Sequence, residues 1–184
     1  DEAVRTIEAT GNKDLVLMQC ITNYPSKIES ANVNVLKTYQ SAFDVLTGYS
    51  DHAPGHVVAL ASVVIGGRVI EKHFTLNKTD KGPDHPHSME PQEFRFMVDS
   101  IREVVRAMGS TRKEVVAEEG ETVYVQRRCL YAKQDLKKGH IMTSEDIDIL
   151  RPALGIPPKF KPMIIGKECK EDIVKGQPLF WNNF

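Results

Sequence analysis

The sequence is poor in cysteine, which limits the kinds of fold it can have. Only Cys20, Cys129 and Cys169 occur among 184 residues, and no two of them form a Cys-x-x-Cys pair. An odd number of widely spaced cysteines excludes a disulfide framework and a structural zinc site. We therefore expect all three thiols to be reduced.

Long apolar runs and an excess of positive charge are also missing. No run of about 18 or more apolar residues occurs, and the first residues lack the basic and apolar regions of a secretory signal. The formal net charge of -1 gives no basic surplus for binding phosphate backbones. These absences argue against membrane and nucleic-acid partners and predict a cytoplasmic protein.

What is present, up to about residue 108, is an alternation of helical and strand-like patterns that is typical of β/α units in a parallel sheet or barrel. The apolar run at 15–20 predicts a buried strand. Three units cannot close an eight-stranded barrel, so we expect a partner or a longer chain to supply the rest. The expected strands are 15–20, 45–49 and 68–73, and the expected helices are 1–10, 30–43 and 91–108. Residues 55–65 fit either a buried helix or a strand, and their position between two strands favours a helix.

A second module follows a polar segment. Residues 110–120 are charged and have no apolar period, which predicts a linker between a domain at 1–109 and another at 121–184. Within the second domain an Asp-apolar-x-Lys-Gly motif occurs twice, with its aspartates at 135 and 172 and its glycines at 139 and 176. The repeat predicts two pseudo-equivalent β units.

Two histidines, His52 and His73, each stand at the end of an expected strand. In a parallel barrel the carboxyl ends of the strands form the active-site mouth, so both imidazoles would point into the same space. Neutral imidazoles on rigid elements suit a catalytic divalent ion. An isolated histidine near a strand is more often structural, but the joint placement beside Tyr24 favours a site. His56, His85, His87 and His140 give no such indication.

The run Ser50-Asp51-His52 does not predict a catalytic triad. Adjacent residues of a strand point to opposite faces, so the three side chains cannot form one relay. Ser50 and His52 can share a face, whereas Asp51 is expected to cap or orient backbone. In the long loop after the third strand, Asp84 can accept hydrogen bonds from sugar hydroxyls or can serve as a turn residue.

These segments resemble the sialic acid synthase family over essentially the whole chain. The second domain resembles the family's antifreeze-protein-like (SAF) domain, a β-clip fold, through its Asp-Leu-Lys-Lys-Gly and Arg-Pro motifs. The barrel matches are Gln19-Cys-Ile-Thr-Asn-Tyr-Pro25, Gly48-Tyr-Ser-Asp-His52, Val69-Ile-Glu-Lys-His-Phe-Thr-Leu76, Gly82-Pro-Asp-His85 and Ser88-Met-Glu-Pro91.

The resemblance implies the last three units of a (β/α)₈ TIM barrel followed by the SAF domain. It also implies condensation of phosphoenolpyruvate with N-acetylmannosamine, or its 6-phosphate, and water, giving a nine-carbon 2-keto sugar acid and phosphate. His52 and His73 would hold a divalent metal ion, Mn²⁺ or Mg²⁺. Tyr24 and Ser50 would line the substrate pocket and Asp84 would contact the sugar.

By the same resemblance, Arg151 would reach the N-acyl end of the sugar in the partner subunit's site, which implies a homodimer with exchanged SAF domains. Two departures matter. Thr22 stands in Ile-Thr-Asn-Tyr, where relatives often have Thr-Ser-x-Tyr or Thr-Asn-x-Tyr. The groups that grip phosphoenolpyruvate come from the first five barrel units in the family, so we expect residues 1–184 alone to be inactive.

Three other interpretations remain. A legionaminic or pseudaminic acid synthase would use the same chemistry on another hexose. A non-catalytic carbohydrate-binding SAF module on a truncated scaffold is less favoured, because residues 121–184 are charged and mixed rather than flat and regular. A metal-dependent hydrolase lacks an identifiable carboxylate ligand or general base.

Overall fold

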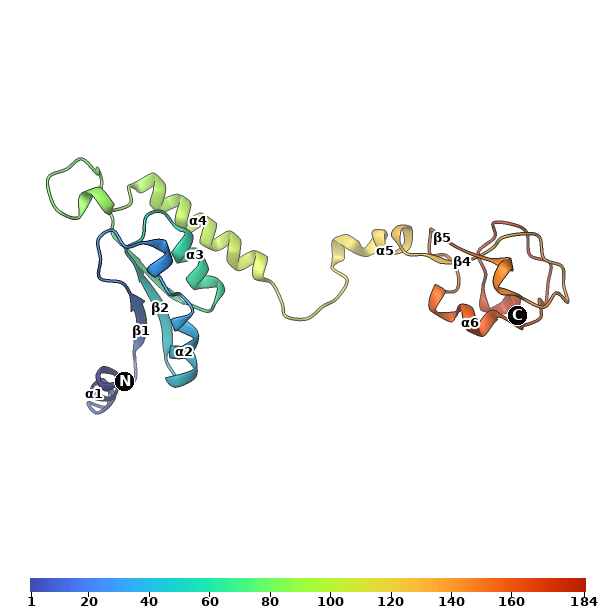
Figure 1. The fold of residues 1–184 in the computed structure, drawn as a ribbon, viewed down its shortest axis with the longest axis horizontal. Helices are drawn as coiled ribbons and strands as arrows, with labels where there is room; N and C mark the ends of the chain where they lie inside the picture. The colour runs from blue at the N-terminus through green and yellow to red at the C-terminus, as the bar shows by residue number, and fades with distance from the viewer. The chain divides into compact units, whose positions relative to one another are not determined.

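The computed structural model describes all 184 residues, which form two units, residues 1–111 and 112–184 (Figure 1). None of the helices combines the length and the apolar character that crossing a membrane requires. All three cysteines are free thiols, as the sequence predicts.

The first unit is a three-stranded parallel sheet in the order β1-β2-β3, with helices between the strands (Figure 1). This confirms the parallel α/β pattern expected from the sequence. The strands are β1 (Val16–Cys20), β2 (Leu46–Asp51) and β3 (Val69–Lys72), and the helices are α1 (Glu2–Glu8), α2 (Val35–Ala42), α3 (Val57–Val64) and α4 (Pro91–Met108).

Helices α3 and α4 pack on each other and on the sheet, and their limits follow local sequence signals. Met97 of α4 and Ala59 of α3 are buried in one cluster, against which Ile70 of β3 packs. Pro91 opens α4 at a position where its missing N–H costs nothing, and Gly109 follows the last turn with a φ of 51°.

Two expectations about this unit are wrong. Strand β1 is only partly buried: Val16 is 38% exposed and Gln19 is its one buried residue, because β1 lies at the edge of the sheet and pairs only with β2. The helix expected over 30–43 begins only at Val35, because Asn32 adopts a left-handed φ of 47° that interrupts helical geometry. Val33 nevertheless packs against the core from outside the helix.

The second unit contains the antiparallel pair β4 (Cys129–Ala132) and β5 (Ile147–Leu150) and the helices α5 (Gly120–Gln126) and α6 (Lys161–Ile164). Helix α5 was not expected from the sequence. A buried cluster that includes Leu130, Ile164 and Leu179 forms the core of this unit.

The repeated Asp-apolar-x-Lys-Gly motifs pair with each other. The backbone N–H of Lys138 donates to Asp172 at 2.8 Å, and that of Lys175 donates to Asp135 at 2.8 Å. The residues Leu136 and Ile173 exchange both backbone hydrogen bonds, at 2.8 Å each. The two copies of the motif therefore lie against each other, and each turn is completed by the carboxylate of the other.

A buried carboxylate fixes another turn of this unit. Asp146 is almost fully buried and accepts hydrogen bonds from Thr143, Gln134 and His140 at 2.7–2.9 Å. Burial opposes ionisation of this group, but these hydrogen bonds outweigh it and lower the pKa of Asp146 far below its ordinary value. The turn therefore depends on a charged Asp146.

Candidate functional site

Strand β2 sends alternate side chains to opposite faces of the sheet, and this separates structural from candidate site residues. Tyr49 is buried and donates from its hydroxyl to the carbonyl of Ala31 at 2.6 Å. Burial, reinforced by the charge of Asp51, raises the pKa of Tyr49 to about 12, so this phenol stays protonated. Ser50 faces the other side, where its hydroxyl donates to Glu71 of β3 at 2.6 Å.

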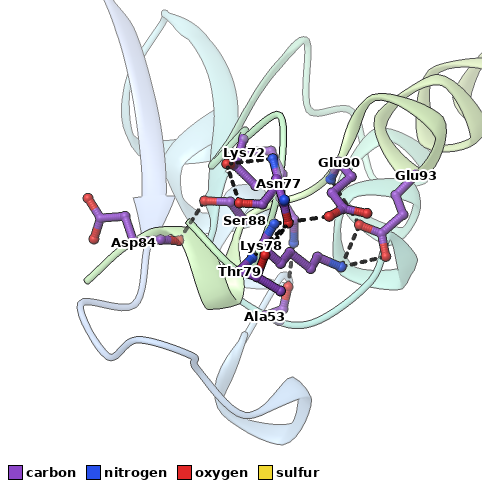
Figure 2. Close-up of polar contacts among 10 residues, drawn as sticks. Ala53, Lys72, Asn77, Lys78, Thr79, Asp84, Ser88, Glu90 and Glu93 are labelled. Atoms are coloured by element: carbon purple, nitrogen blue, oxygen red, sulfur yellow. Dashed lines mark hydrogen bonds and ion pairs between the residues drawn. The ribbon is translucent and has the colours of Figure 1, made fainter. Parts of the chain in front are cut away.

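One residue further along β2, a buried ion pair joins the ends of β2 and β3. Asp51 and Lys72 are register partners, their charged atoms lie 2.9 Å apart, and their side chains are 1% and 2% exposed. The second oxygen of Asp51 accepts the backbone N–H of Ala53 at 2.9 Å, and Lys72 also donates to the carbonyl of Ala53 (Figure 2). The expectation that Asp51 orients backbone rather than serving a triad is confirmed.

Because Asp51 and Lys72 are paired, the next residues, His52 and His73, are brought to the same level and the same face. Their ring centroids are 5.1 Å apart and nearly perpendicular, at 85°. The two imidazoles therefore meet at the carboxyl ends of β2 and β3.

The hydrogen bond of His52 determines which of its ring nitrogens has a free lone pair and could bind a metal ion. Nδ1 lies 2.7 Å from the carbonyl oxygen of Ile21, and a carbonyl only accepts, so Nδ1 carries the proton. The neutral ring then has its lone pair on Nε2. A histidine that binds a metal through one ring nitrogen usually donates a hydrogen bond from the other nitrogen, as Nδ1 does here.

Tyr24, in the loop after β1, connects the rings of this site. Its own ring lies 4.2 Å from that of His52 and 5.3 Å from those of His73 and His87. Tyr24 is 52% exposed, so part of its side chain is open to solvent. The neighbouring Thr22 is exposed in the same loop.

The long loop after β3 returns to the strand end and adds a third imidazole. Met89 accepts from Thr75 and donates to His73 through the backbone, at 3.0 and 2.8 Å. This return brings His87 beside His73, with ring centroids 5.1 Å apart. One nitrogen or oxygen atom from each of His73, Asp84 and His87 lies within 4.8 Å of the others.

Several side-chain contacts fix the shape of this loop. Ser88 donates to the carbonyl of Asp84 at 2.6 Å, and the backbone N–H of Lys78 donates to Glu90 at 3.0 Å (Figure 2). Lys78 also pairs with Glu93 of α4 at 2.6 Å. The carboxylate of Asp84 remains 66% exposed beside the imidazoles, where it can accept hydrogen bonds or a cation.

Six of the seven predicted site residues belong to the first unit. Tyr24, Ser50, His52 and His73 lie at the ends of the strands, Asp84 lies beside His73 in the loop after β3, and Thr22 lies in the same loop as Tyr24. Arg151 belongs to the second unit, exposed just after β5, and its role stays a prediction.

Sequence reasoning missed Glu71 and His87. Glu71 could have been found, because it stands two residues before His73 on an expected strand and so shares its face. No sequence pattern places His87, since its position depends on how the loop folds back. The structure also supplies carboxylates near the imidazoles, Glu71 and Asp84, which the sequence alone did not identify as possible ligands or bases.

Comparison with known protein families identifies both units. Residues 1–113 match the NeuB family and residues 127–184 match the SAF domain. The chain belongs to the NeuB family. The match spans the three β/α units that carry the imidazole cluster.

The relatives of this NeuB-family chain include sugar-acid synthases. N,N'-diacetyllegionaminic acid synthase of Campylobacter jejuni is 38% identical over 94% of this chain and 53% of its own length. N-acetylneuraminate-9-phosphate synthase of Homo sapiens is 36% identical over 82% and 42%. The crystal structure of the N-acetylneuraminic acid (sialic acid) synthetase of Leptospira borgpetersenii is 30% identical, with a TM-score of 0.59 over 66% of this chain and 43% of that one. The chain spans about half the length of the curated relatives it matches.

Proposed function

We propose that this chain is the cation- and sugar-binding portion of a sialic acid synthase. The reaction joins phosphoenolpyruvate, N-acetylmannosamine or its 6-phosphate, and water, and yields N-acetylneuraminate or its 9-phosphate and inorganic phosphate. The observation that carries the proposal is the meeting of His52 and His73 at neighbouring strand ends. Membership of the NeuB family and the names of the relatives support it.

The residues present fit a divalent cation. The lone pair of His52 lies on Nε2, and His73 has Asp84 and His87 beside it. A cation held there, Mn²⁺ or Mg²⁺, would polarise the aldehyde oxygen of an open-chain sugar. The half-exposed ring of Tyr24 beside His52 and His73 marks the solvent-facing side from which such an aldehyde could approach.

The chain's own side chains would orient the substrates. Tyr24 offers a flat apolar wall against which a sugar can lie, and the exposed carboxylate of Asp84 can accept hydrogen bonds from its hydroxyls. Ser50 is held by Glu71, so its hydroxyl oxygen is available as an acceptor, and Glu71 can hold or release a proton. Thr22 adds a hydroxyl in the same loop as Tyr24.

We further propose that the three β/α units are part of a (β/α)₈ barrel and that the protein acts as a homodimer with exchanged SAF domains. In that arrangement Arg151 of one subunit would bind the N-acyl end of the sugar in the other. The support is the family resemblance, together with the exposure of Arg151, which leaves its guanidinium free to reach a ligand.

A second candidate is a legionaminic or pseudaminic acid synthase. The 38% identity to the Campylobacter jejuni legionaminic acid enzyme favours it. The chemistry at His52 and His73 would be unchanged, and only the hexose would differ.

The test is phosphate release from phosphoenolpyruvate by the complete protein of the reading frame that encodes these residues. Each N-acyl hexosamine is supplied in turn, with and without EDTA. We expect release with one sugar, loss of release with EDTA, and loss in His73→Ala. Absence of release with every sugar would contradict the synthase function.

A further inference from the structure

We propose that His87 is a ligand of the cation, together with His73 and Asp84. This inference rests on the cation of the proposed function and goes further by naming a ligand that the sequence did not indicate. It comes from the loop geometry, because the sequence placed His87 in a loop without any function.

The first observation is an unsatisfied nitrogen. Nε2 of His87 is buried and has no hydrogen-bond partner in the structure. The nearest charged group, Asp84, lies 3.7 Å away, which is too far for a hydrogen bond. A buried nitrogen without a partner is unfavourable, and a metal ion would satisfy it.

The second observation concerns the groups that lie near His87. One ring nitrogen of His87 and one donor atom each of His73 and Asp84 lie within 4.8 Å of one another, a separation that ligands of one ion can have. The ring of His52 also lies 5.1 Å from that of His73 but is not among these donors. Two imidazoles and one carboxylate are therefore close enough together to hold one ion.

The third observation is that the loop is held in this conformation. The hydroxyl of Thr75 lies 2.7 Å from Nδ1 of His85, and Ser88 donates to the carbonyl of Asp84 at 2.6 Å. These contacts lie on both sides of His87 and orient it toward His73 before any ligand binds. A preorganised donor loses less entropy on binding.

The chemistry of the donors determines the metal. Mg²⁺ prefers oxygen ligands and retains its waters, whereas imidazole nitrogen suits Mn²⁺ less well than Co²⁺ or Zn²⁺ but better than it suits Mg²⁺. A set with two imidazoles and one carboxylate therefore favours the transition metals over Mg²⁺. We expect Co²⁺, Zn²⁺ and Mn²⁺ to bind this chain at lower concentrations than Mg²⁺.

The experiment measures binding of Co²⁺ and Mn²⁺ to the complete protein by calorimetry, for the unchanged sequence, His87→Ala and the control His56→Ala. His56 contacts Phe96 and lies outside the cluster. We expect His87→Ala to weaken binding by at least about 10-fold, as loss of a metal-supporting group does, and His56→Ala to leave it unchanged. Pulsed EPR of bound Mn²⁺ should lose one nitrogen coupling in His87→Ala.

Misfolding is controlled by melting each variant in EDTA. If His87→Ala unfolds, His87→Phe takes its place, because it keeps a ring against Tyr24 but has no nitrogen. Unchanged affinity and unchanged nitrogen couplings would overturn the role of His87. If His73→Ala then still abolishes binding, the proposed cation site stands; if it does not, that site fails as well. Phosphate release by the complete protein separately decides the synthase function.

Discussion

The buried ion pair between Asp51 and Lys72 can be tested by replacing Lys72 with methionine. At 2.9 Å, two unit charges at an effective dielectric constant of about 20 attract by about 6 kcal/mol, which desolvation largely offsets. Removing one partner leaves the other charge buried and unpaired. We therefore expect Lys72→Met to lower the free energy of unfolding of the first unit by about 3–5 kcal/mol.

A matched control is the ion pair between Lys78 and Glu93, whose side chains are 36% and 46% exposed. Solvent screens that pair, so Lys78→Met should cost only about 0–1 kcal/mol. Adding Asp51→Asn to Lys72→Met should recover part of the loss, because the unpaired charge is gone and the introduced amide oxygen can still accept from Ala53.

Urea unfolding followed by circular dichroism reports mainly on the first unit, which contains α1–α4. The fluorescence of Trp181, the only tryptophan, reports on the second unit and serves as an internal standard. We expect Lys72→Met to shift the dichroism transition and to leave the fluorescence transition in place. Equal shifts for Lys72→Met and Lys78→Met would refute the reasoning.

Three further predictions concern the second unit, the sheet and the assembly. The pKa of Asp146 is lower in the folded than in the unfolded chain, so the stabilisation from its charge is complete above the unfolded value of about 3.9 and is lost as the pH falls below that value. Tryptophan fluorescence in urea should show this loss of stability between about pH 5 and pH 2. The loss should be smaller in Asp146→Asn. Gly48→Ala should cost about 1–3 kcal/mol by dichroism, because the added carbon would lie 2.4 Å from the carbonyl oxygen of Val69; an unchanged midpoint would disprove that contact. In the complete protein, mixing inactive Arg151→Ala and His73→Ala subunits should restore part of the phosphate release if domains are exchanged, and no recovery would contradict the exchange.

Much of the first unit could be predicted from its periodicities. The apolar runs before His52 and His73 indicate parallel strands, and the common face of the two imidazoles follows from strand geometry. The burial of β1 could not be predicted, because burial depends on neighbours that a single strand's sequence does not reveal. The start of α2 was also missed, since one left-handed residue, Asn32, interrupts a pattern that otherwise repeats.

The candidate site was predictable only where it lies on regular elements. Ser50 and His52 could be assigned to one face by counting residues along a strand. The contribution of His87 could not, because it requires the loop to return through Met89 to the end of β3. Side chains carried by long loops are positioned by contacts between distant residues, and no local rule of sequence describes them.

The reciprocal turns of the second unit imply how it must fold. The carboxylate that completes one turn is separated by 34 residues from the amide it serves, and the other by 40. Neither turn is complete until both halves of the unit have met. The entropic cost of closing two long loops is therefore incurred before either turn gains its stabilising hydrogen bond. Formation of this small domain is therefore a single concerted event, slower than its size suggests, rather than a sequence of independent hairpins.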